Sequence, residues 1–269
     1  MSLATTYRIS EAKPLRWPSL SRARWLSPVA LLLLWELGAR LGVIPPRILA
    51  APSTVLETFW SLTASGELPK NLAVSLARAS AGLLIALIVA VTLGLVSGLS
   101  RWGETLVDPV MQIKRTIPVL ALTPLFIVWF GIGETPKIVL IAVSATFPLY
   151  LNLFSGIRGV DVRLVEAARS FGLKGWSLVR EVILPGALPS FFVGLRYALG
   201  VSVLVLVISE QINAQAGLGY LVNNARDFMR TDIIVVCLVV YALLGLSADA
   251  FVRTLERKTL AWRPSLVEQ

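Results

Sequence analysis

Long apolar segments dominate this chain and restrict what it can fold into. A helix needs about 20 apolar residues to cross the hydrocarbon of a bilayer. Six segments approach or exceed that length, at 26–44, 72–99, 106–130, 137–157, 188–212 and 232–251. The chain is also 56% hydrophobic and 15% charged, whereas a soluble domain carries about 25% charged residues. The sequence therefore predicts an all-α polytopic membrane protein with six transmembrane helices.

Several kinds of chemistry are missing from the sequence. The chain has no histidine, which is the commonest general base and transition-metal ligand. Its one cysteine, Cys237, lies inside an apolar segment and has no partner for an intramolecular disulfide. We find no zinc-ligand spacing, no phosphate-binding glycine loop and no GxSxG motif. We therefore predict no catalytic residue, metal site or cofactor, and any ATP that drives this protein must bind another subunit.

The distribution of basic residues predicts how the chain lies in the membrane. The 25 Lys and Arg residues exceed the 16 Asp and Glu residues, an excess typical of loops that face anionic lipid. Fifteen Lys and Arg residues lie in the two tails, the turn at Arg101 and the segment around 158–186, against five in the opposite loops. By the positive-inside rule we expect both termini in the cytoplasm. The expected division is a cytoplasmic tail at 1–25, a transmembrane domain at 26–256 and a second tail at 257–269.

A polar segment separates the fourth and fifth apolar segments. It predicts one short helix at Arg163–Phe171, with Asp161 as its N-cap, and a second at Gly175–Ile183 that ends near Pro185. Gly172 joins the two helices and permits a sharp turn. Apolar side chains recur at helical spacing in the first helix, at Leu164, Ala167, Ala168 and Phe171. Such a helix is too short to span lipid and suits a groove on a soluble partner.

The same segment resembles a known loop. Glu166-Ala167-Ala168, three residues, Gly172, nine residues and then Val182-Ile183-Leu184-Pro185 are similar to the EAA loop of ABC importer permeases, with Val182 in place of the usual isoleucine. The alternative is an ordinary amphipathic surface helix that ends at a glycine. The resemblance implies that the segment at 158–186 holds a coupling helix for a cytoplasmic ATPase. The residues that it implies for coupling are Glu166, Ala167, Ala168 and Gly172, with Arg163 and Arg169 at the rim.

Further segments narrow the resemblance to one branch of these permeases. The segments at 99–104, 129–132, 183–190 and 224–228 are similar to the nitrate, sulfonate and taurine branch, and within it to the aliphatic sulfonate permeases. The resemblance implies a type I ABC importer permease fold in the bacterial inner membrane. It also implies that two copies of the chain pair, that two ATPase subunits dock on them, and that a periplasmic or lipid-anchored binding protein delivers the substrate.

Four ionisable residues within the apolar segments are candidates for a substrate path. Lys114 and Arg115 precede a proline break in the third segment, and an anionic substrate needs such counter-charges. The alternative is that both side chains extend to the cytoplasmic headgroups. Arg196 lies early in the fifth segment and could be structural. Glu210 lies late in the same segment, and either pairs with one of these bases or lies at an outer gate.

Two further expectations concern the outer face and the solute. The polar segment at 213–231, with Gly217-Leu218-Gly219-Tyr220, predicts an external re-entrant or surface element. Taurine, nitrate or another small solute would suit the same architecture. A different class is an ion-gradient-driven secondary transporter, in which Glu210 would bind a proton or sodium ion, but we see no inverted repeat. A membrane scaffold without transport is a third class, which the proline breaks and the EAA spacing disfavour.

Overall fold

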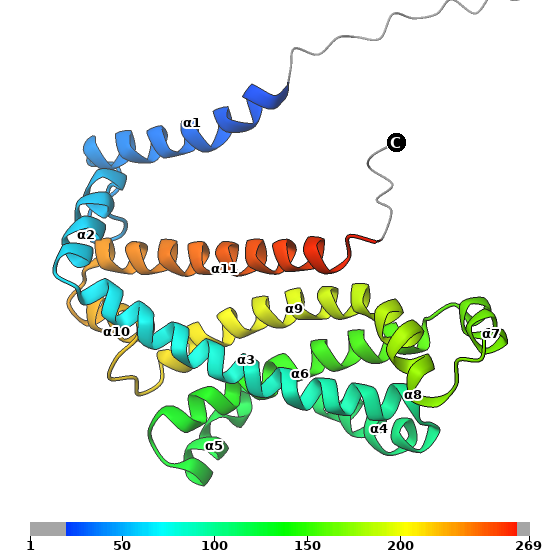
Figure 1. Ribbon diagram of the computed structural model, residues 1–269. Helices are drawn as coiled ribbons and strands as arrows, with labels where there is room; N and C mark the ends of the chain where they lie inside the picture. Colours follow the sequence, from blue (N-terminus) through cyan, green and yellow to red (C-terminus); the bar gives the residue numbers. More distant parts are fainter. Residues whose placement is uncertain (1–19, 263–269) are drawn as a thin grey trace, which may run out of the picture.

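The structure is a computed structural model that describes residues 20–262, with side chains from residue 26 onward (Figure 1). Its long helices are α1 (Leu20–Arg40), α3 (Glu67–Leu99), α4 (Arg101–Thr116), α6 (Glu134–Arg158), α9 (Leu184–Glu210) and α11 (Thr231–Thr259). Its short elements are α2 (Pro52–Ala64), η1 (Val119–Leu122), α5 (Thr123–Phe130), α7 (Val162–Ser170), α8 (Gly175–Leu178), η2 (Val179–Ile183) and α10 (Leu218–Asp227). No strand occurs in residues 20–262, so the all-α class is confirmed. Residues 1–19 and 263–269 of the expected tails lie outside the described residues.

The predicted multi-pass architecture is confirmed, but the predicted number of six spans is not reached. Within residues 20–262, α3, α6, the α8–α9 run and α11 are long and apolar enough to cross a membrane. A fifth span results if α4 and the bent segment after it count as one. α1 does not pass the same test, because ionisable residues flank its apolar centre on both sides. α1 as the sixth span stays a prediction.

Small residues let the central helices pack closely. α3 buries a row of them at every fourth position: Gly82, Ala86, Ala90, Gly94 and Gly98. A Cβ atom added at Gly82 would lie 2.6 Å from a methyl carbon of Ile141, and one at Gly98 would lie 2.8 Å from Ile157. In a membrane, where apolar surface alone does not drive helices together, such close backbone approach stabilises the pair. α3 and α6, together with α9, therefore form the core of the bundle.

The third apolar segment is irregular, as its prolines predict. α4 ends at Thr116, and the helical segment that follows Pro118 is bent by 88° relative to it. Ile117, the residue before Pro118, has extended backbone angles (φ −80°, ψ 120°), as the proline ring requires. Pro109 lies inside α4, and Pro124 lies in the first turn of α5, where a proline is tolerated. Pro118 is therefore the proline that breaks the span.

The second polar helix does not end near Pro185, and this prediction is wrong. α8 leads into the π-helical turn η2, and η2 leads directly into α9. The N–H group of Leu184 bonds to the carbonyl of Val179, five residues back. This wider turn shifts the hydrogen-bond register just before Pro185. The N–H group that a proline lacks therefore falls in the first turn of α9. The polar segment is thereby joined to the fifth span without an interruption.

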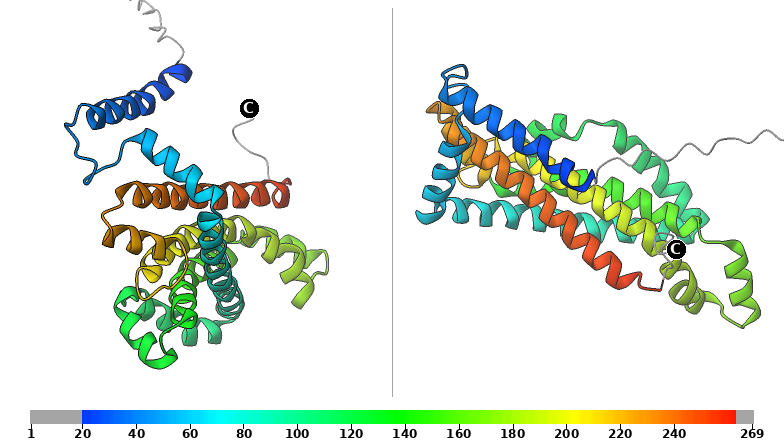
Figure 2. Two further views of the ribbon diagram at one scale, coloured as in Figure 1. Left: turned by 90° about the vertical axis from the view of Figure 1, so that its left-hand side faces the viewer. Right: turned by 90° about the horizontal axis from the view of Figure 1, so that it is seen from above.

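The two ends of the bundle carry different elements. α7 and α8 lie at one end of the long helices, and α2 and α10 lie at the other (Figures 1 and 2). The start of α1 and the end of α11 both point toward the end that carries α7. The described ends of the chain are therefore on the same side of the bundle as the polar segment.

α1 is joined to the rest of the molecule mainly through α2. Its Glu36 accepts hydrogen bonds from the backbone N–H (3.0 Å) and hydroxyl (2.9 Å) of Ser53, in the first turn of α2. Arg40 lies 2.5 Å from the same carboxylate. The leucines along α1 remain exposed, for example Leu31 at 67% and Leu33 at 64%. Lipid or another polypeptide must cover this apolar surface in the membrane.

Candidate functional site

Both ends of α7 are closed by defined caps. Asp161 accepts a hydrogen bond from the N–H of Arg163 at 2.9 Å, which confirms it as the predicted N-cap. At the other end the N–H of Gly172 bonds to the carbonyl of Arg169, and the N–H of Leu173 bonds to the carbonyl of Ala168. These two bonds form a Schellman motif, which requires a left-handed residue at Gly172, where φ is +88°. The caps hold α7 as a separate, well-formed helix.

The predicted coupling residues are divided between two faces of α7. Glu166, Ala167, Arg163 and Arg169 are exposed, whereas Ala168 is buried against the rest of the chain. The apolar residues Leu164 (59%) and Phe171 (88%) are also exposed, although they share the expected apolar spacing with Ala168. This chain therefore packs against only part of the apolar side of α7. The remaining apolar surface and both arginines are available to a partner.

α7 is held close to the start of the fifth span. A Cβ atom added at Gly186 of α9 would lie 3.0 Å from a methyl carbon of Val160, just before α7. The α8–η2–α9 run supplies a second, continuous connection from the other end of the polar segment. A displacement of α7 would therefore be transmitted to α9 from both ends.

Lys114 lies in the last turn of α4, next to the 88° bend. Its side chain is partly buried, and its ammonium group donates a hydrogen bond to the backbone carbonyl of Val143 on α6. Among the ion pairs of the described side chains, none involves Lys114. Arg115, the next residue, lies with its guanidinium carbon 6.0 Å from the ring centre of Phe147. Both cations therefore face α6, and neither has a carboxylate partner among the side chains that the structure describes.

Arg196 occupies a different part of the molecule. Its guanidinium group lies 3.2 Å from Asp249 and 2.7 Å from Glu256, both on α11. These pairs join the first half of α9 to the C-terminal part of α11. Its charge is thus balanced within the chain, as the structural alternative expects.

Glu210, at the opposite end of α9, has 0% exposure and pairs with Arg78 of α3 at 2.7 Å. It does not pair with Lys114, Arg115 or Arg196. Arg78 is absent from the sequence-based predictions, although it continues a polar row with Asn71 and Ser75 at helical spacing. That row within an apolar span was the available signal. Of the four predicted path residues, only Lys114 and Arg115 lie together.

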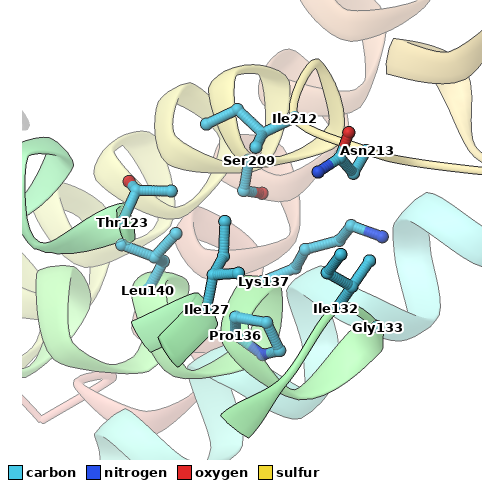
Figure 3. Close-up of a pocket in the computed structure, with 10 residues that line it drawn as sticks. All are labelled: Thr123, Ile127, Ile132, Gly133, Pro136, Lys137, Leu140, Ser209, Ile212 and Asn213. Carbon is cyan, nitrogen blue, oxygen red and sulfur yellow. The ribbon is translucent and has the colours of Figure 1, made fainter. Parts of the chain in front are cut away.

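A small pocket lies between α5, α6 and the end of α9 (Figure 3). Lys137 and Ser209 are among the residues that line it, and most of the others are apolar. The ammonium group of Lys137 lies 3.2 Å from Glu134, which also pairs with Arg78. The charge of Lys137 is therefore compensated within the protein, in contrast to that of Lys114.

Known proteins share both the sequence and the fold. Residues 82–261 match the family described as binding-protein-dependent transport system inner membrane component. The chain is 49% identical over 254 residues to an Escherichia coli (strain K12) protein named as aliphatic sulfonates transport permease protein SsuC, covering 94% of this chain and 97% of that protein. It is 36% identical over 255 residues to the taurine transport system permease protein TauC of the same organism, covering 92% of each. A crystal structure of an amino acid ABC transporter has a chain with the same fold, with a TM-score of 0.59 at 18% identity, covering 74% of this chain and 96% of that one.

Proposed function

Because this chain belongs to the family of binding-protein-dependent transport system inner membrane components, which are ABC permeases, we propose that it carries aliphatic sulfonates across the inner membrane. The multi-pass bundle and its type I importer permease fold supply the membrane part of such a transporter. ATP hydrolysis then belongs to a partner ATPase, and substrate delivery belongs to a binding protein. Two copies of this chain would enclose the path, with two ATPase subunits beneath them.

The observation that carries this proposal is the capped helix α7 with its uncovered face. Exposed Leu164 and Phe171, together with Arg163 and Arg169, form a mixed apolar and basic surface outside the spans. Such a surface fits a groove of a soluble protein better than lipid. We assign docking on the ATPase to this surface, with Glu166, Ala167 and Gly172 toward the partner. Ala168 would instead carry the motion into the permease.

Coupling in this arrangement is mechanical. When the ATPase subunits close around ATP, the grooves that hold the two α7 helices move. Each α7 lies against α9 at its start through Val160 and Gly186, and leads into α9 at its end through α8 and η2, so this motion tilts the fifth span relative to its neighbours. The cavity between the two copies would then open alternately toward each side. The excess of basic residues in the segment at 158–186 and in both tails supports a cytoplasmic location for them, and the described chain ends lie on that same side.

Lys114 and Arg115 are the path residues that the geometry favours for an anion. A cation without a carboxylate partner is costly at membrane depth, and a passing sulfonate would supply the missing counter-charge. Both cations also lie beside the 88° bend, and broken helices commonly line translocation paths. Arg196 and Glu210 are paired within the chain and fit this task less well.

The test is ATP hydrolysis by the permease reconstituted with its cognate ATPase and binding protein. The panel consists of short alkanesulfonates, taurine and nitrate, each added to saturate the binding protein. We expect the alkanesulfonates to stimulate hydrolysis most strongly. Stimulation by taurine or nitrate alone would replace the proposed substrate while keeping the architecture. A permease that moves sulfonate with an ion gradient and no ATPase would overturn the proposal as a whole.

Replacing Lys114 with alanine is expected to lower sulfonate uptake by about tenfold or more, since a hydrogen bond to a charged group contributes about 1.5–3 kcal/mol. Uptake is measured in proteoliposomes, and assembly with the ATPase is measured in parallel by gel filtration. Lys70→Ala, which removes an exposed lysine from the first turn of α3, is the control and should transport normally. Normal uptake by the Lys114→Ala variant would show that this side chain only joins α4 to α6 through Val143 and does not serve the substrate.

A further inference from the structure

The turn into α10 is held by side chains from other helices. The N–H of Gly217 donates to Asn71 at 2.7 Å, and the N–H of Leu218 donates to Ser75 at 2.9 Å. The N–H of Gly219 donates to Glu210 at 2.9 Å. Three consecutive N–H groups, which a helix start leaves without helical partners, are thus bonded to buried side chains. We call Asn71, Ser75, Arg78 and Glu210 the α10 clamp.

Three of the four clamp residues come from one face of α3. Asn71, Ser75 and Arg78 are separated by about one helical turn each, so they point toward the same neighbour. Arg78 extends the contact by donating to the carbonyl of Ala216 at 2.7 Å. All three are buried, at 6%, 0% and 3% exposure. This polar row serves the α10 turn within an otherwise apolar helix.

Glu210 balances the charge of the clamp and connects it to further helices. Its carboxylate accepts hydrogen bonds from Arg78 (2.7 Å) and from the hydroxyl of Tyr241 on α11 (3.0 Å). The hydroxyl of Ser75 lies 2.7 and 2.8 Å from its two oxygens. Arg78 also makes a two-point contact with Glu134 of α6. The clamp therefore joins α3, α6, α9, α10 and α11.

Two glycines make the clamp possible. Gly217 has φ +108°, and a Cβ atom there would lie 2.5 Å from Arg78 and Glu210. A Cβ atom at Gly219 would lie 2.4 Å from the Cβ of Glu210. The Gly217-Leu218-Gly219 sequence is thus explained by backbone that passes directly against a buried ion pair.

We propose that the clamp is a positioning device for transport, which keeps α10 fixed on the outer face so that its exposed side chains receive the loaded binding protein. This inference rests on the proposed function. α10 lies at the end of the bundle opposite α7, and Tyr220, Asn224 and Arg226 are exposed on it. A buried polar network whose side chains are all hydrogen-bonded is costly to open. The clamp therefore stays closed and moves together with the ends of α3, α9 and α11 that carry it, when α7 displaces the opposite end of α9.

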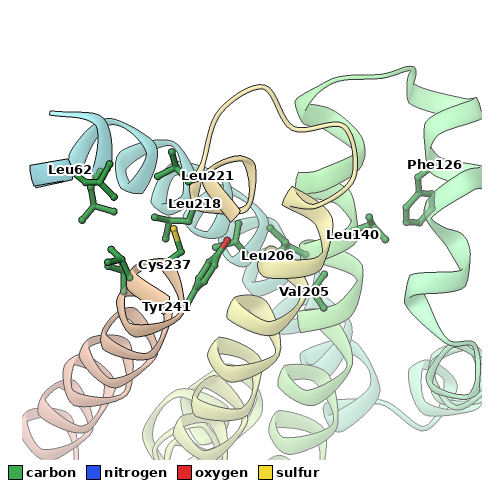
Figure 4. Packing of buried hydrophobic residues seen from close by; sticks show 13 residues of the cluster. Leu62, Phe126, Leu140, Val205, Leu206, Leu218, Leu221, Cys237 and Tyr241 are labelled. Atoms are coloured by element: carbon green, nitrogen blue, oxygen red, sulfur yellow. The ribbon is translucent and has the colours of Figure 1, made fainter. Parts of the chain in front are cut away.

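A native residue reports whether α10 is held in place. Cys237, the one cysteine of the chain, is 0% exposed and belongs to the same hydrophobic cluster as Leu218 and Leu221 of α10 (Figure 4). When α10 leaves its position, the thiol becomes accessible to water and to small reagents. Its alkylation rate thus measures the clamp without requiring transport.

The experiment compares Ser75→Ala and Glu210→Gln with the wild-type permease in its reconstituted complex. Ser75→Ala removes contacts to Glu210 and Leu218 but leaves the ion pair, so it is the milder variant. We expect N-ethylmaleimide to alkylate Cys237 about tenfold faster in both, as loss of a charge-assisted hydrogen bond implies. The control is Ser144→Ala, which removes a buried hydroxyl that bonds within α6 only.

The same variants are then titrated with loaded binding protein while ATP hydrolysis is measured. We expect the half-saturating concentration to rise by about tenfold, with a smaller effect on the maximal rate. Unchanged alkylation in both variants would show that the clamp does not hold α10. Faster alkylation with unchanged half-saturation would show that α10 does not receive the binding protein. Failure of the sulfonate assignment is distinguishable from both outcomes, because alkylation needs neither substrate nor ATP.

Discussion

Replacing Gly172 with valine is expected to abolish the stimulation of ATP hydrolysis by substrate. Gly172 has φ +88° in the Schellman motif that ends α7. A left-handed conformation costs a non-glycine residue about 1–2 kcal/mol, and a β-branched residue is particularly unfavourable there. The variant would lose the cap and change the direction in which the chain leaves α7. Because a Cβ atom at this position meets no atom within 4 Å, the rest of the permease should fold and insert normally.

The measurement is substrate-stimulated hydrolysis by the reconstituted complex, with insertion checked by membrane fractionation. Gly172→Asn separates the effect of losing the left-handed conformation from the effect of adding a side chain. Asparagine tolerates the left-handed conformation better than other non-glycine residues. It should retain a substantial part of the coupling. Gly245→Val, at a helical glycine of α11 with open space around it, is the matched control and should couple normally. Full coupling in Gly172→Val would remove α7 from its proposed role.

Replacing Arg78 with methionine is expected to lower the stability of the permease by about 3–5 kcal/mol, the usual result of removing one partner of a buried ion pair. Glu210 is fully buried and would lose its counter-charge, and the carbonyl of Ala216 would lose a donor. Thermal unfolding in detergent should shift downward by roughly 10 °C, given about 2–4 °C for each kcal/mol in a chain of this size. Arg78→Lys should restore part of the loss, because a lysine supplies the charge but not the guanidinium geometry.

Arg226→Met provides the control for this experiment. Arg226 is 68% exposed and lies 3.8 Å from Asp227, so its ion pair contributes little. Its removal should leave the unfolding temperature nearly unchanged. A small shift in Arg78→Met, equal to that of Arg226→Met, would contradict the role of Arg78 at the centre of the buried network.

The sequence predicted the main elements of the fold because their signals are local. Long apolar segments indicate α3, α6, α9 and α11, since a backbone in lipid must satisfy its own hydrogen bonds within each helix. The break in the third segment follows from the fixed ring of Pro118. The N-cap Asp161 and the turn at Gly172 also depend only on neighbouring residues. Pro185 misled the prediction because the π-helical turn η2, just before it, accommodates the proline without ending the helical run.

The candidate sites depend on side chains that lie far apart in the sequence, so the sequence did not predict which partners each charged residue meets. Lys114 and Glu210 look alike in the sequence, as ionisable residues within apolar segments. The tertiary structure separates them, because Glu210 bonds to Arg78, Ser75 and Tyr241 from α3 and α11. Lys114 instead donates to a backbone carbonyl and joins no ion pair within residues 26–262. No local pattern records which charges become paired.

The sequence by itself thus determined that the chain crosses a membrane, where four of its spans and its capped polar helix lie, and which family it resembles. The tertiary structure decided that the polar segment continues into the fifth span, which cations keep an unbalanced charge, and why Gly217 and Gly219 precede α10. The physical reason is the range of the interactions. Hydrophobicity, proline geometry and helix caps act within a few residues, whereas the partners of a buried charge come from segments more than 100 residues apart, as Ser75 and Glu210 do.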